Sequence, residues 1–276
     1  MPLLTTEKAL MAALQRAMAA DERVIFLGPG VATRCPALLA AFGAERVRNT
    51  PLAETALIGC AMGAAAMGLR PVVDLGCSPL RALYSLENAA WLSPGGAEFP
   101  LVLLARSGAE AVFAQLPGLQ VLMPSTPADA AGLLGGALSQ PRPSLLFSDV
   151  GLAVEAADVA GNELILPGQA LIRHHGDTLT LVACGAAVHA CLAVAPALDA
   201  DVIDLRSLRP LDTAAVLASV RRTGRLVCVG EAGGVAAELC ALAAENAFTA
   251  LKAPPLRLTH SEQLAARARA LMNTPT

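Results

Sequence analysis

The segment Asn49-Thr50-Pro51-Leu52-Ala53-Glu54 leads into a long run of apolar residues, and the rest of the chain is organised around it. Pro51 lacks an N–H group and has a fixed φ, so it suits the first turn of a helix, with Thr50 as the cap and Glu54 inside that turn. Glu54 is the only charged residue of the whole segment. The sequence therefore predicts a buried helix over 50–68, with one carboxylate at its positive end facing a partly dry site.

Two other interpretations of this helix stay open from spacing alone. Glu54 could reach back to a free amide and simply cap its own helix, because acidic residues are common in first turns. Gly59, Gly63 and Gly68 permit the close approach of another backbone, which could belong to the same chain or to another subunit.

Composition sets the scale and the material of the core. The chain has 276 residues, of which 55% are hydrophobic, 16% charged and 3% aromatic. This length is enough for two domains, and their cores must be built from Ala, Leu and Val. So many small residues favour close helix packing and large interfaces between subunits.

Charge and cysteine usage exclude several classes of protein. The net charge of −3 and the pI of about 5.8 argue against nucleic acid as a partner, because phosphate binding needs a basic surface. The N-terminus lacks the pattern of a signal peptide, and we expect no membrane span. The seven cysteines form no CxxC pair and most lie in apolar runs, so we expect reduced, buried thiols in a cytoplasmic protein.

Apolar runs of strand length alternate with helical segments along the whole chain. Strands are predicted at 24–27, 46–48, 71–75, 101–105, 120–123, 144–147, 179–183, 201–204, 225–229 and 256–258. Helices are predicted at 8–19, 31–42, 50–68, 80–92, 128–138, 186–198, 213–222, 234–250 and 261–272. This alternation predicts an α/β fold with two domains, 1–150 and 169–276, each a mostly parallel sheet flanked by helices. The acidic stretch 151–168 is expected to be an irregular linker.

The segment 49–54 resembles the Asp-Thr-Pro-(Leu/Ile)-(Ala/Ser)-Glu turn of the β subunits of thiamine diphosphate-dependent 2-oxoacid dehydrogenases, the E1 component. It resembles the pyrimidine-binding domain of transketolase more loosely. The match continues in order through Gly68-Leu69-Arg70-Pro71-Val72, Leu116-Pro117-Gly118-Leu119-Gln120-Val121, Pro124-Ser125-Thr126-Pro127, Leu166-Pro167-Gly168-Gln169-Ala170 and Val202-Ile203-Asp204-Leu205-Arg206-Ser207-Leu208-Arg209-Pro210-Leu211-Asp212. The resemblance implies a pyrimidine-binding domain over 1–150 and a transketolase C-terminal-like domain over 169–276.

The resemblance also implies roles for individual residues. Glu54 would hydrogen-bond the aminopyrimidine ring of thiamine diphosphate and so activate the cofactor for attack on a 2-oxo acid. Leu52 would lie beside the cofactor. Ser78 or Leu80 stands where the family often has an aromatic side chain against the ring, and Tyr84 is a less suitable substitute. Arg106 is a candidate for binding the substrate carboxylate.

Only half of the cofactor can be held by this chain. In the resembled family the diphosphate and its Mg²⁺ are bound by a Gly-Asp-Gly motif that is followed by an Asn, and no Gly-Asp-Gly occurs here. We therefore expect no metal ligands in this chain and a separate E1 α-like subunit that carries that motif. The family's arrangement implies an α₂β₂ heterotetramer with a β/β contact.

The chain departs from the family in ways that leave the reaction's acceptor open. The family's loop before Leu116 contains a histidine used in acyl transfer to lipoamide, and the short connection after Arg106 has none. Pro29 and Gly30 replace acidic residues after the first strand. The acceptor could be a lipoyl or other carrier protein, or a small aldehyde or ketone in a carboligation. The alternatives are the β half of a split transketolase and a catalytically eroded assembly subunit, a pseudoenzyme.

The remaining polar candidates are expected to be structural. His174 and His175 lie near the domain junction without a third ligand at metal spacing. His189 is expected to be a satisfied or surface histidine, and His260 at most part of an interface. Glu231 resembles a turn of the family's second domain and is expected to be structural.

Overall fold

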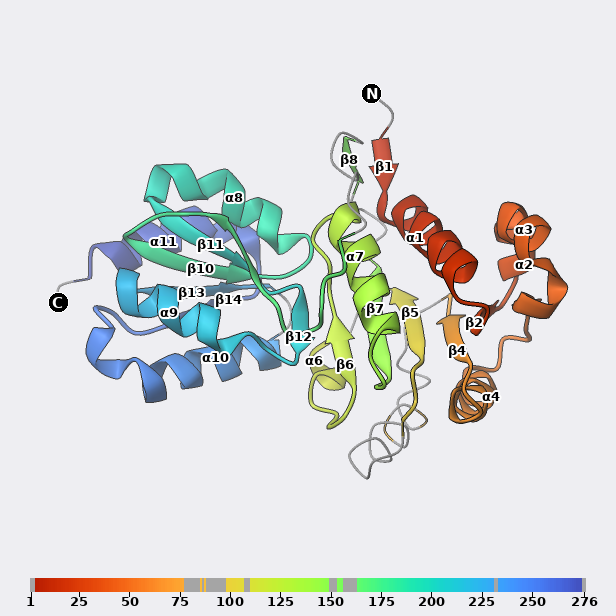
Figure 1. Cartoon of the computed structure of the whole chain (residues 1–276). Coiled ribbons are helices and arrows are strands. Elements are labelled where there is room, and N and C mark those ends of the chain that lie inside the picture. Colours follow the sequence, from red (N-terminus) through yellow and green to blue (C-terminus); the bar gives the residue numbers. More distant parts are fainter. Residues whose placement is uncertain are drawn as a thin grey trace. The chain divides into compact units, whose positions relative to one another are not determined.

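The computed structural model describes residues 3–76, 85, 87, 98–106, 110–148, 153–155, 163–230 and 233–274. The chain falls into two compact units, Met1–Pro167 and Gly168–Thr276 (Figure 1). Both units contain a largely parallel sheet with helices packed against it. The predicted two-domain α/β fold is confirmed.

The first unit is built on a parallel sheet whose strands run in the order β6-β7-β5-β4-β2-β3. The strands of this unit are β1 (Leu3–Thr5), β2 (Val24–Gly28), β3 (Val47–Asn49), β4 (Arg70–Asp74), β5 (Val102–Arg106), β6 (Gln120–Leu122), β7 (Ser144–Ser148) and β8 (Ala153–Glu155). Its helices are α1 (Thr6–Ala20), α2 (Val31–Arg34), α3 (Pro36–Arg46), α4 (Glu54–Ala66), α6 (Glu110–Phe113) and α7 (Pro127–Leu138). Each predicted strand of this half is present, with its ends moved by one or two residues. The predicted helix at 80–92 lies almost wholly outside the described residues.

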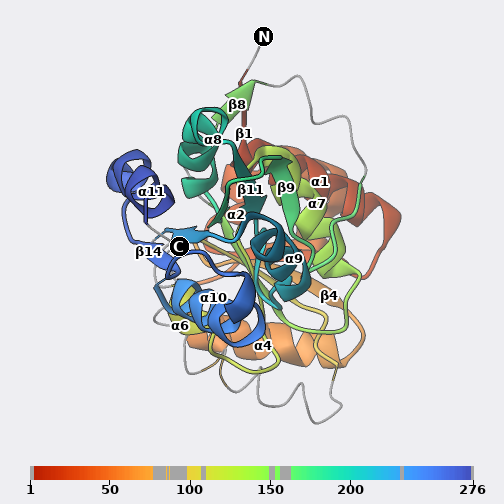
Figure 2. The same ribbon diagram turned by 90° about the vertical axis from the view of Figure 1, so that its left-hand side faces the viewer.

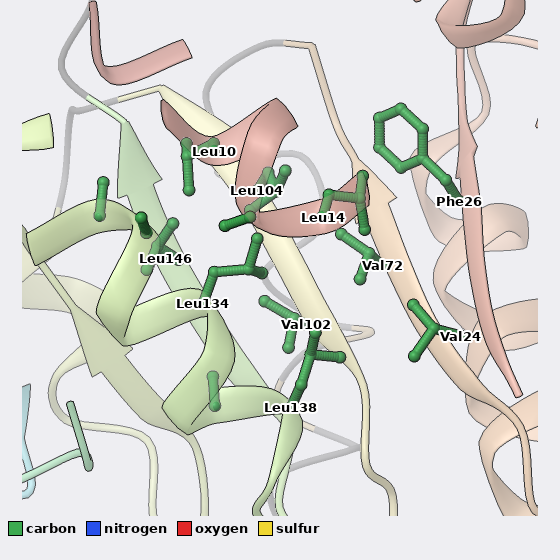
Figure 3. Packing of buried hydrophobic residues seen from close by; sticks show 14 of the residues in the cluster. Leu10, Leu14, Val24, Phe26, Val72, Val102, Leu104, Leu134, Leu138 and Leu146 are labelled. Atoms are coloured by element: carbon green, nitrogen blue, oxygen red, sulfur yellow. The ribbon is translucent and has the colours of Figure 1, made fainter. Parts of the chain in front are cut away.

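Helices α1 and α7 pack against each other and cover one face of this sheet. Figure 3 shows Leu10 and Leu14 of α1 gathered with Leu134 and Leu138 of α7 around Val102 on β5. The side chain of Thr5 caps α1 by accepting a hydrogen bond from the N–H of Lys8 at 3.3 Å. Leu10, Leu14 and Met18 recur at helical spacing and form the buried face of α1.

Two local features of the first unit differ from the prediction. The expected helix over 31–42 is two helices, α2 and α3, which meet at the non-helical Cys35, and Pro36 begins the second. A short strand, β8, lies inside the stretch expected to be irregular, where it pairs antiparallel with β1. Neither segment has the length or alternation that makes a strand recognisable in a sequence.

Helix α4 begins later and is more exposed than the sequence predicts. It starts at Glu54, and its N-cap is Ala53, which offers no side-chain hydrogen bond, so Thr50 is not the cap. Only Leu57, Ile58, Ala61 and Ala65 are buried. Because the helix is apolar on all sides, its composition predicts that it is buried. In the single chain much of its surface is exposed instead.

Glycines on α7 allow another segment to lie directly on that helix. A Cβ at Gly136 would overlap the backbone carbonyl of Ile165, and Ile165 N–H also donates to Gly132 O at 3.0 Å. We expect Gly136→Ala to lower the free energy of unfolding by about 2 kcal/mol, because backbone cannot give way as a flexible side chain can. Chemical denaturation would measure this effect. Gly63→Ala, where a Cβ meets open space, is the matched helical control and should be neutral or slightly stabilising. Equal stabilities of the two variants would contradict the argument.

The second unit has a sheet in the order β14-β13-β10-β11-β9, in which only β9 runs antiparallel. Its strands are β9 (Leu171–His174), β10 (Leu179–Ala183), β11 (Ala200–Asp204), β12 (Ser207–Arg209), β13 (Leu226–Val229) and β14 (Leu256–Leu258). Its helices are α8 (Ala187–Leu198), α9 (Thr213–Thr223), α10 (Gly233–Asn246) and α11 (Leu264–Met272). In Figures 1 and 2 the strands of this unit lie between α8 and α11 on one side and α9 and α10 on the other. Strand β9 was not predicted.

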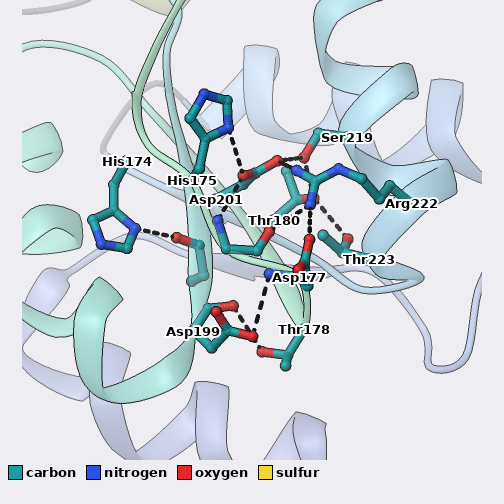
Figure 4. Close-up of polar contacts among 12 residues, drawn as sticks. His174, His175, Asp177, Thr178, Thr180, Asp199, Asp201, Ser219, Arg222 and Thr223 are labelled. Carbon is teal, nitrogen blue, oxygen red and sulfur yellow. Dashed lines mark hydrogen bonds and ion pairs between the residues drawn. The ribbon is translucent and has the colours of Figure 1, made fainter.

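A buried carboxylate organises the polar contacts at the start of β10 and β11 (Figure 4). Asp201 is fully buried and accepts hydrogen bonds from Ser219 Oγ at 2.5 Å and from the N–H of Gly176 at 2.9 Å. Arg222 forms an ion pair with the same carboxylate. Burial opposes ionisation of Asp201, but these hydrogen bonds and the nearby positive charge outweigh it and lower the pKa of the carboxyl group.

No helix in the described part of the chain combines the length and the apolar character needed to cross a bilayer.

Candidate functional site

The turn from Thr50 to Glu54 is fixed by the ends of two neighbouring strands. The N–H of Thr50 donates to Gly28 O, at the end of β2, at 3.1 Å. Asn49, the last residue of β3, accepts a hydrogen bond from the N–H of Ala32 through Oδ1 at 2.8 Å. Glu54 follows as the first residue of α4 and is partly exposed. The turn therefore carries its carboxylate at the carboxyl end of the sheet, where parallel α/β folds bind ligands.

A cavity of about 440 Å³ lies at the carboxyl ends of the central strands, and we call it the strand-end cavity. Its walls include Leu52 from the turn, Asp74 at the end of β4 and Arg106 at the end of β5. Chain order reverses between β2 and β4, because β3 lies on the far side of β2. This position is the topological switch point at which such sheets bind ligands.

The strand-end cavity contains a strong ion pair. Arg34 Nη2 contacts Asp74 Oδ2 at 2.6 Å and also donates to Pro29 O at 3.2 Å. Asp74 Oδ1 accepts a hydrogen bond from the N–H of Gly76 at 2.8 Å. Burial disfavours the charged guanidinium, but the hydrogen bond and the charge of Asp74 outweigh it, so the pKa of Arg34 is raised. The pair is therefore charged and held in place.

A second cavity, of about 430 Å³, lies on the other side of the turn, and we call it the α4 cavity. Pro51, Ala53 and Leu57 contribute to its apolar lining. Thr50 also lines it, and Thr50 Oγ1 is buried without a hydrogen-bond partner among the described residues. A buried hydroxyl in this state calls for a partner, which can be a water molecule, a ligand or another chain.

The structure brings together some of the predicted site residues. Leu52 and Arg106 line one cavity, while Glu54 lies in the same turn as Leu52. Ser78 and Leu80, predicted to contact the cofactor, lie outside the described residues, as do Tyr84 and Glu231. Sequence reasoning did not identify Arg34 and Asp74. Asp74 could have been found, because an acidic residue that ends a buried strand lies at the ligand-binding edge.

His174 and His175, which were expected to be structural, both lie beside β11. His174 Nδ1 lies 2.9 Å from Ala200 O, and His175 is exposed 3.7 Å from Asp201. Gly176 and Asp177 lie in the turn between β9 and β10. In the described ranges no three His, Cys, Asp or Glu residues gather at metal-binding distances.

The cysteines in the described part of the chain are free thiols, but they are not uniformly buried. Cys184, Cys191 and Cys228 are buried, whereas Cys60 on α4 is exposed. Cys77 lies outside the described residues. The prediction of buried cysteines is therefore wrong for Cys60, for the same reason that the burial of α4 was overestimated.

Comparison with known proteins defines the class to which this fold and turn belong. Residues 3–76 match the family described as Transketolase, pyrimidine binding domain, and residues 168–272 match Transketolase, C-terminal domain. A solved structure titled "Split gene transketolase, inactive beta4 tetramer" superposes with a TM-score of 0.83, over 99% of both chains at 19% identity, which supports the fold. The protein is thus a transketolase-like pair of domains.

The curated relatives narrow the class. The chain is 37% identical to the pyruvate dehydrogenase E1 component subunit beta of Drosophila melanogaster, covering 92% of this chain and 80% of the relative. It is 35% identical to subunit beta-2 from Oryza sativa subsp. japonica, covering 94% and 79%. It is 32% identical to the 2-oxoisovalerate dehydrogenase subunit beta of Bacillus subtilis, covering 91% and 87%. The chain belongs to the family of 2-oxoacid dehydrogenase E1 β subunits.

Proposed function

We propose that this chain is the β-like subunit of a two-component thiamine diphosphate-dependent enzyme that decarboxylates a 2-oxo acid, and that it is active only with an α partner. The observation that carries the proposal is Glu54 at the first position of α4, in a turn whose other residues line the strand-end cavity and the α4 cavity. Membership of the E1 β family supports it.

The turn suits the pyrimidine half of the cofactor. An aminopyrimidine is a flat ring with apolar faces and a polar edge. The α4 cavity has a mostly apolar lining with two charged residues, Glu45 and Arg48, and it contains the buried Thr50 Oγ1, which has no partner among the residues described. Leu52 is 66% exposed in the single chain and lines the strand-end cavity on the other side of the turn. Glu54 lines neither cavity but belongs to the turn between them, so the proposal places the ring at that turn.

Two residues of the turn, Glu54 and Leu52, have defined tasks in this proposal. Glu54 accepts a hydrogen bond at N1′ of the pyrimidine, and the positive end of α4 stabilises its charge. Leu52 contacts the ring and excludes water. When bound, thiamine diphosphate supplies the nucleophilic carbon and the electron sink that decarboxylation of a 2-oxo acid requires. Arg106 and the strand-end cavity lie where substrate would approach.

The other half of the cofactor requires a second chain. The sequence contains no Gly-Asp-Gly motif for the diphosphate and its Mg²⁺. An E1 α-like subunit would supply these groups, and an α₂β₂ assembly would bring the two half-sites together. Co-expression with a partner that contains Gly-Asp-Gly, followed by measurement of CO₂ release from 2-oxo acids, tests this proposal. The absence of turnover with every such partner would favour the pseudoenzyme.

The exposed face of α4 supports assembly. Gly59 and Gly63 lie one turn apart on the exposed surface of α4, and a Cβ added to either would meet no described atom within 4 Å. Packing within the described part of the chain therefore does not require these glycines. Met67, at the end of the same helix, is 86% exposed. We propose that this face packs against another subunit, where the glycines would allow two backbones to approach.

Substitution at this face should separate folding from assembly. We expect Gly59→Leu to leave the thermal stability of the chain alone unchanged or slightly raised, because a Cβ at this position meets open space and Leu favours a helix more than Gly does. The same change should weaken association with other subunits at least tenfold, measured by analytical ultracentrifugation. Ala41→Leu, on the exposed side of α3, is the matched control. Unchanged association of the Gly59 variant would exclude this face as an interface.

The acceptor of the reaction distinguishes the remaining candidates. Acyl transfer to a lipoyl domain would assign the chain to the dehydrogenases, despite the missing loop histidine. Transfer to an aldehyde or ketone would indicate a carboligase or a split transketolase. Incubating the assembled enzyme with both kinds of acceptor and identifying the product separates these outcomes.

A further inference from the structure

Helix α2 is capped by a side chain from the strand that leads into the turn of Glu54. Its own N-cap residue, Gly30, has no side chain and so cannot cap the helix. Instead, Asn49 Oδ1 accepts a hydrogen bond from the N–H of Ala32, the second residue of α2, at 2.8 Å. Asn49 ends β3 and immediately precedes the turn that carries Glu54. The cap therefore ties α2 to that turn.

The other end of α2 is held at the end of β4. Arg34, the last residue of α2, pairs with Asp74 Oδ2 at 2.6 Å and also donates to Pro29 O at 3.2 Å. Asp74 is itself oriented by a hydrogen bond from the N–H of Gly76. Side chains therefore fix α2 at both ends, with partners that lie 17 and 40 positions away in the sequence.

The position of Asn49 is passed on to Glu54 through a short and stiff connection. The N–H of Thr50, the next group along the backbone, donates to Gly28 O at 3.1 Å, so the chain is held from two sides where it enters the turn. Only four residues separate Asn49 from Glu54, and one of them is Pro51, whose φ is fixed. A shift of the strand end would therefore move the first turn of α4.

We propose that Asn49 and Arg34 are positioning residues for Glu54: they hold α2 as a brace between the turn and the end of β4, and so fix where the carboxylate stands. The inference rests on the proposed function for the role of Glu54 in activating the cofactor. Neither positioning side chain has to touch the cofactor for this effect. Catalysis is sensitive to such positioning, since a misplacement of about 1 Å can cost on the order of 10²-fold in rate.

Loss of the cap should loosen the turn in the chain alone, without any cofactor. Asn49→Leu removes the acceptor of the Ala32 N–H, whereas Asn49→Asp keeps an oxygen in the same place. Hydrogen exchange of the full chain, followed by NMR, measures the opening of individual amides. The amides of Ala32 and Thr50 should exchange at least tenfold faster in Asn49→Leu and at the normal rate in Asn49→Asp.

The same variants should change proton transfer in the assembled enzyme. Asn49→Leu should slow exchange of the C2 proton of bound thiamine diphosphate at least tenfold, and Asn49→Asp should restore the rate. Arg34→Gln, which removes the ion pair with Asp74, should give a smaller loss. The double variant should be at most about twofold slower than Asn49→Leu, because a brace released at one end no longer depends on the other. This exchange needs no substrate, so an effect of Arg34 on substrate approach does not enter.

Thr126→Ala is the matched control for the loss of a helix cap in the same unit. Thr126 Oγ1 accepts a hydrogen bond from the N–H of Asp129 at 3.1 Å at the start of α7, and it lines neither cavity. Because both Thr126→Ala and Asn49→Leu remove one cap, their melting temperatures should fall alike. Only Asn49→Leu should slow C2 exchange, a difference that a merely structural role of Asn49 does not produce.

Three results would overturn the brace. They are normal exchange of the Ala32 and Thr50 amides in Asn49→Leu, no recovery of C2 exchange in Asn49→Asp, and equal slowing of C2 exchange in Thr126→Ala. Failure of the proposed function would appear as normal C2 exchange in Glu54→Gln, and the amide measurement would still decide whether the brace exists. Failure of the brace would appear as slow C2 exchange in Glu54→Gln together with normal exchange in Asn49→Leu.

Discussion

Glu54→Gln is expected to lower the turnover of the assembled enzyme by about 10² to 10⁴, the range over which a positioned proton-transfer group acts. The amide has the same shape as the carboxylate, so the turn and α4 should stay intact. The change removes the negative charge that would hold the proton at N1′ of the pyrimidine. Exchange of the C2 proton of bound thiamine diphosphate for deuterium, followed by NMR, measures this step apart from substrate binding.

The control for this experiment is an acid on the same unit but far from the turn in the chain. Glu22 lies exposed between α1 and β2, and Glu22→Gln removes an equal charge. Its exchange rate should match that of the unchanged enzyme. If Glu54→Gln also exchanged at the normal rate, the carboxylate would only cap its helix and the catalytic assignment would be lost.

Asp201→Asn should lower the free energy of unfolding of the second unit by about 3 kcal/mol. Arg222 would lose its buried partner, and the amide cannot accept all the hydrogen bonds that the carboxylate accepts from Ser219 and Gly176. Denaturation monitored by circular dichroism measures the loss. Asp199→Asn is the control, because that residue is exposed and Asn tolerates its left-handed φ of 46°.

The same substitution should change how stability depends on pH. The folded state lowers the pKa of Asp201, so the carboxylate's contribution is complete above its unfolded value of about 4 and is lost as the pH falls through the folded pKa. The unchanged protein should therefore lose stability below about pH 4 more steeply than Asp201→Asn. If the two proteins lost stability equally steeply below pH 4, the role given to Asp201 and its hydrogen-bond partners would be contradicted.

The sequence was most informative where periodicity and burial agree. The apolar runs at β2, β5 and β10 are central parallel strands, and runs of this kind are recognisable because both of their faces are buried. The bounds of helix α9 were also predictable from the sequence. Asp212 accepts a hydrogen bond from the N–H of Ala215 at its start, and Gly224 ends it in a left-handed conformation.

The sequence was least informative where an element depends on contacts that it does not encode locally. Strands β1 and β8 stabilise only each other, and β9 is an antiparallel edge strand with exposed Leu171 and Ile172. The Arg34–Asp74 pair joins residues 40 positions apart, so no local pattern points to it. The cytoplasmic location expected from the cysteines stays a prediction.

The apolar surface of α4 also bears on how a cell must produce this protein. A chain made in excess of its partners would expose the apolar surface around Gly59, Gly63 and Met67 to chaperones and proteases. Balanced synthesis of the two subunits would then be a requirement for solubility as well as for catalysis. The helix that begins with the proposed catalytic acid would thereby make the abundance of each polypeptide depend on that of the other.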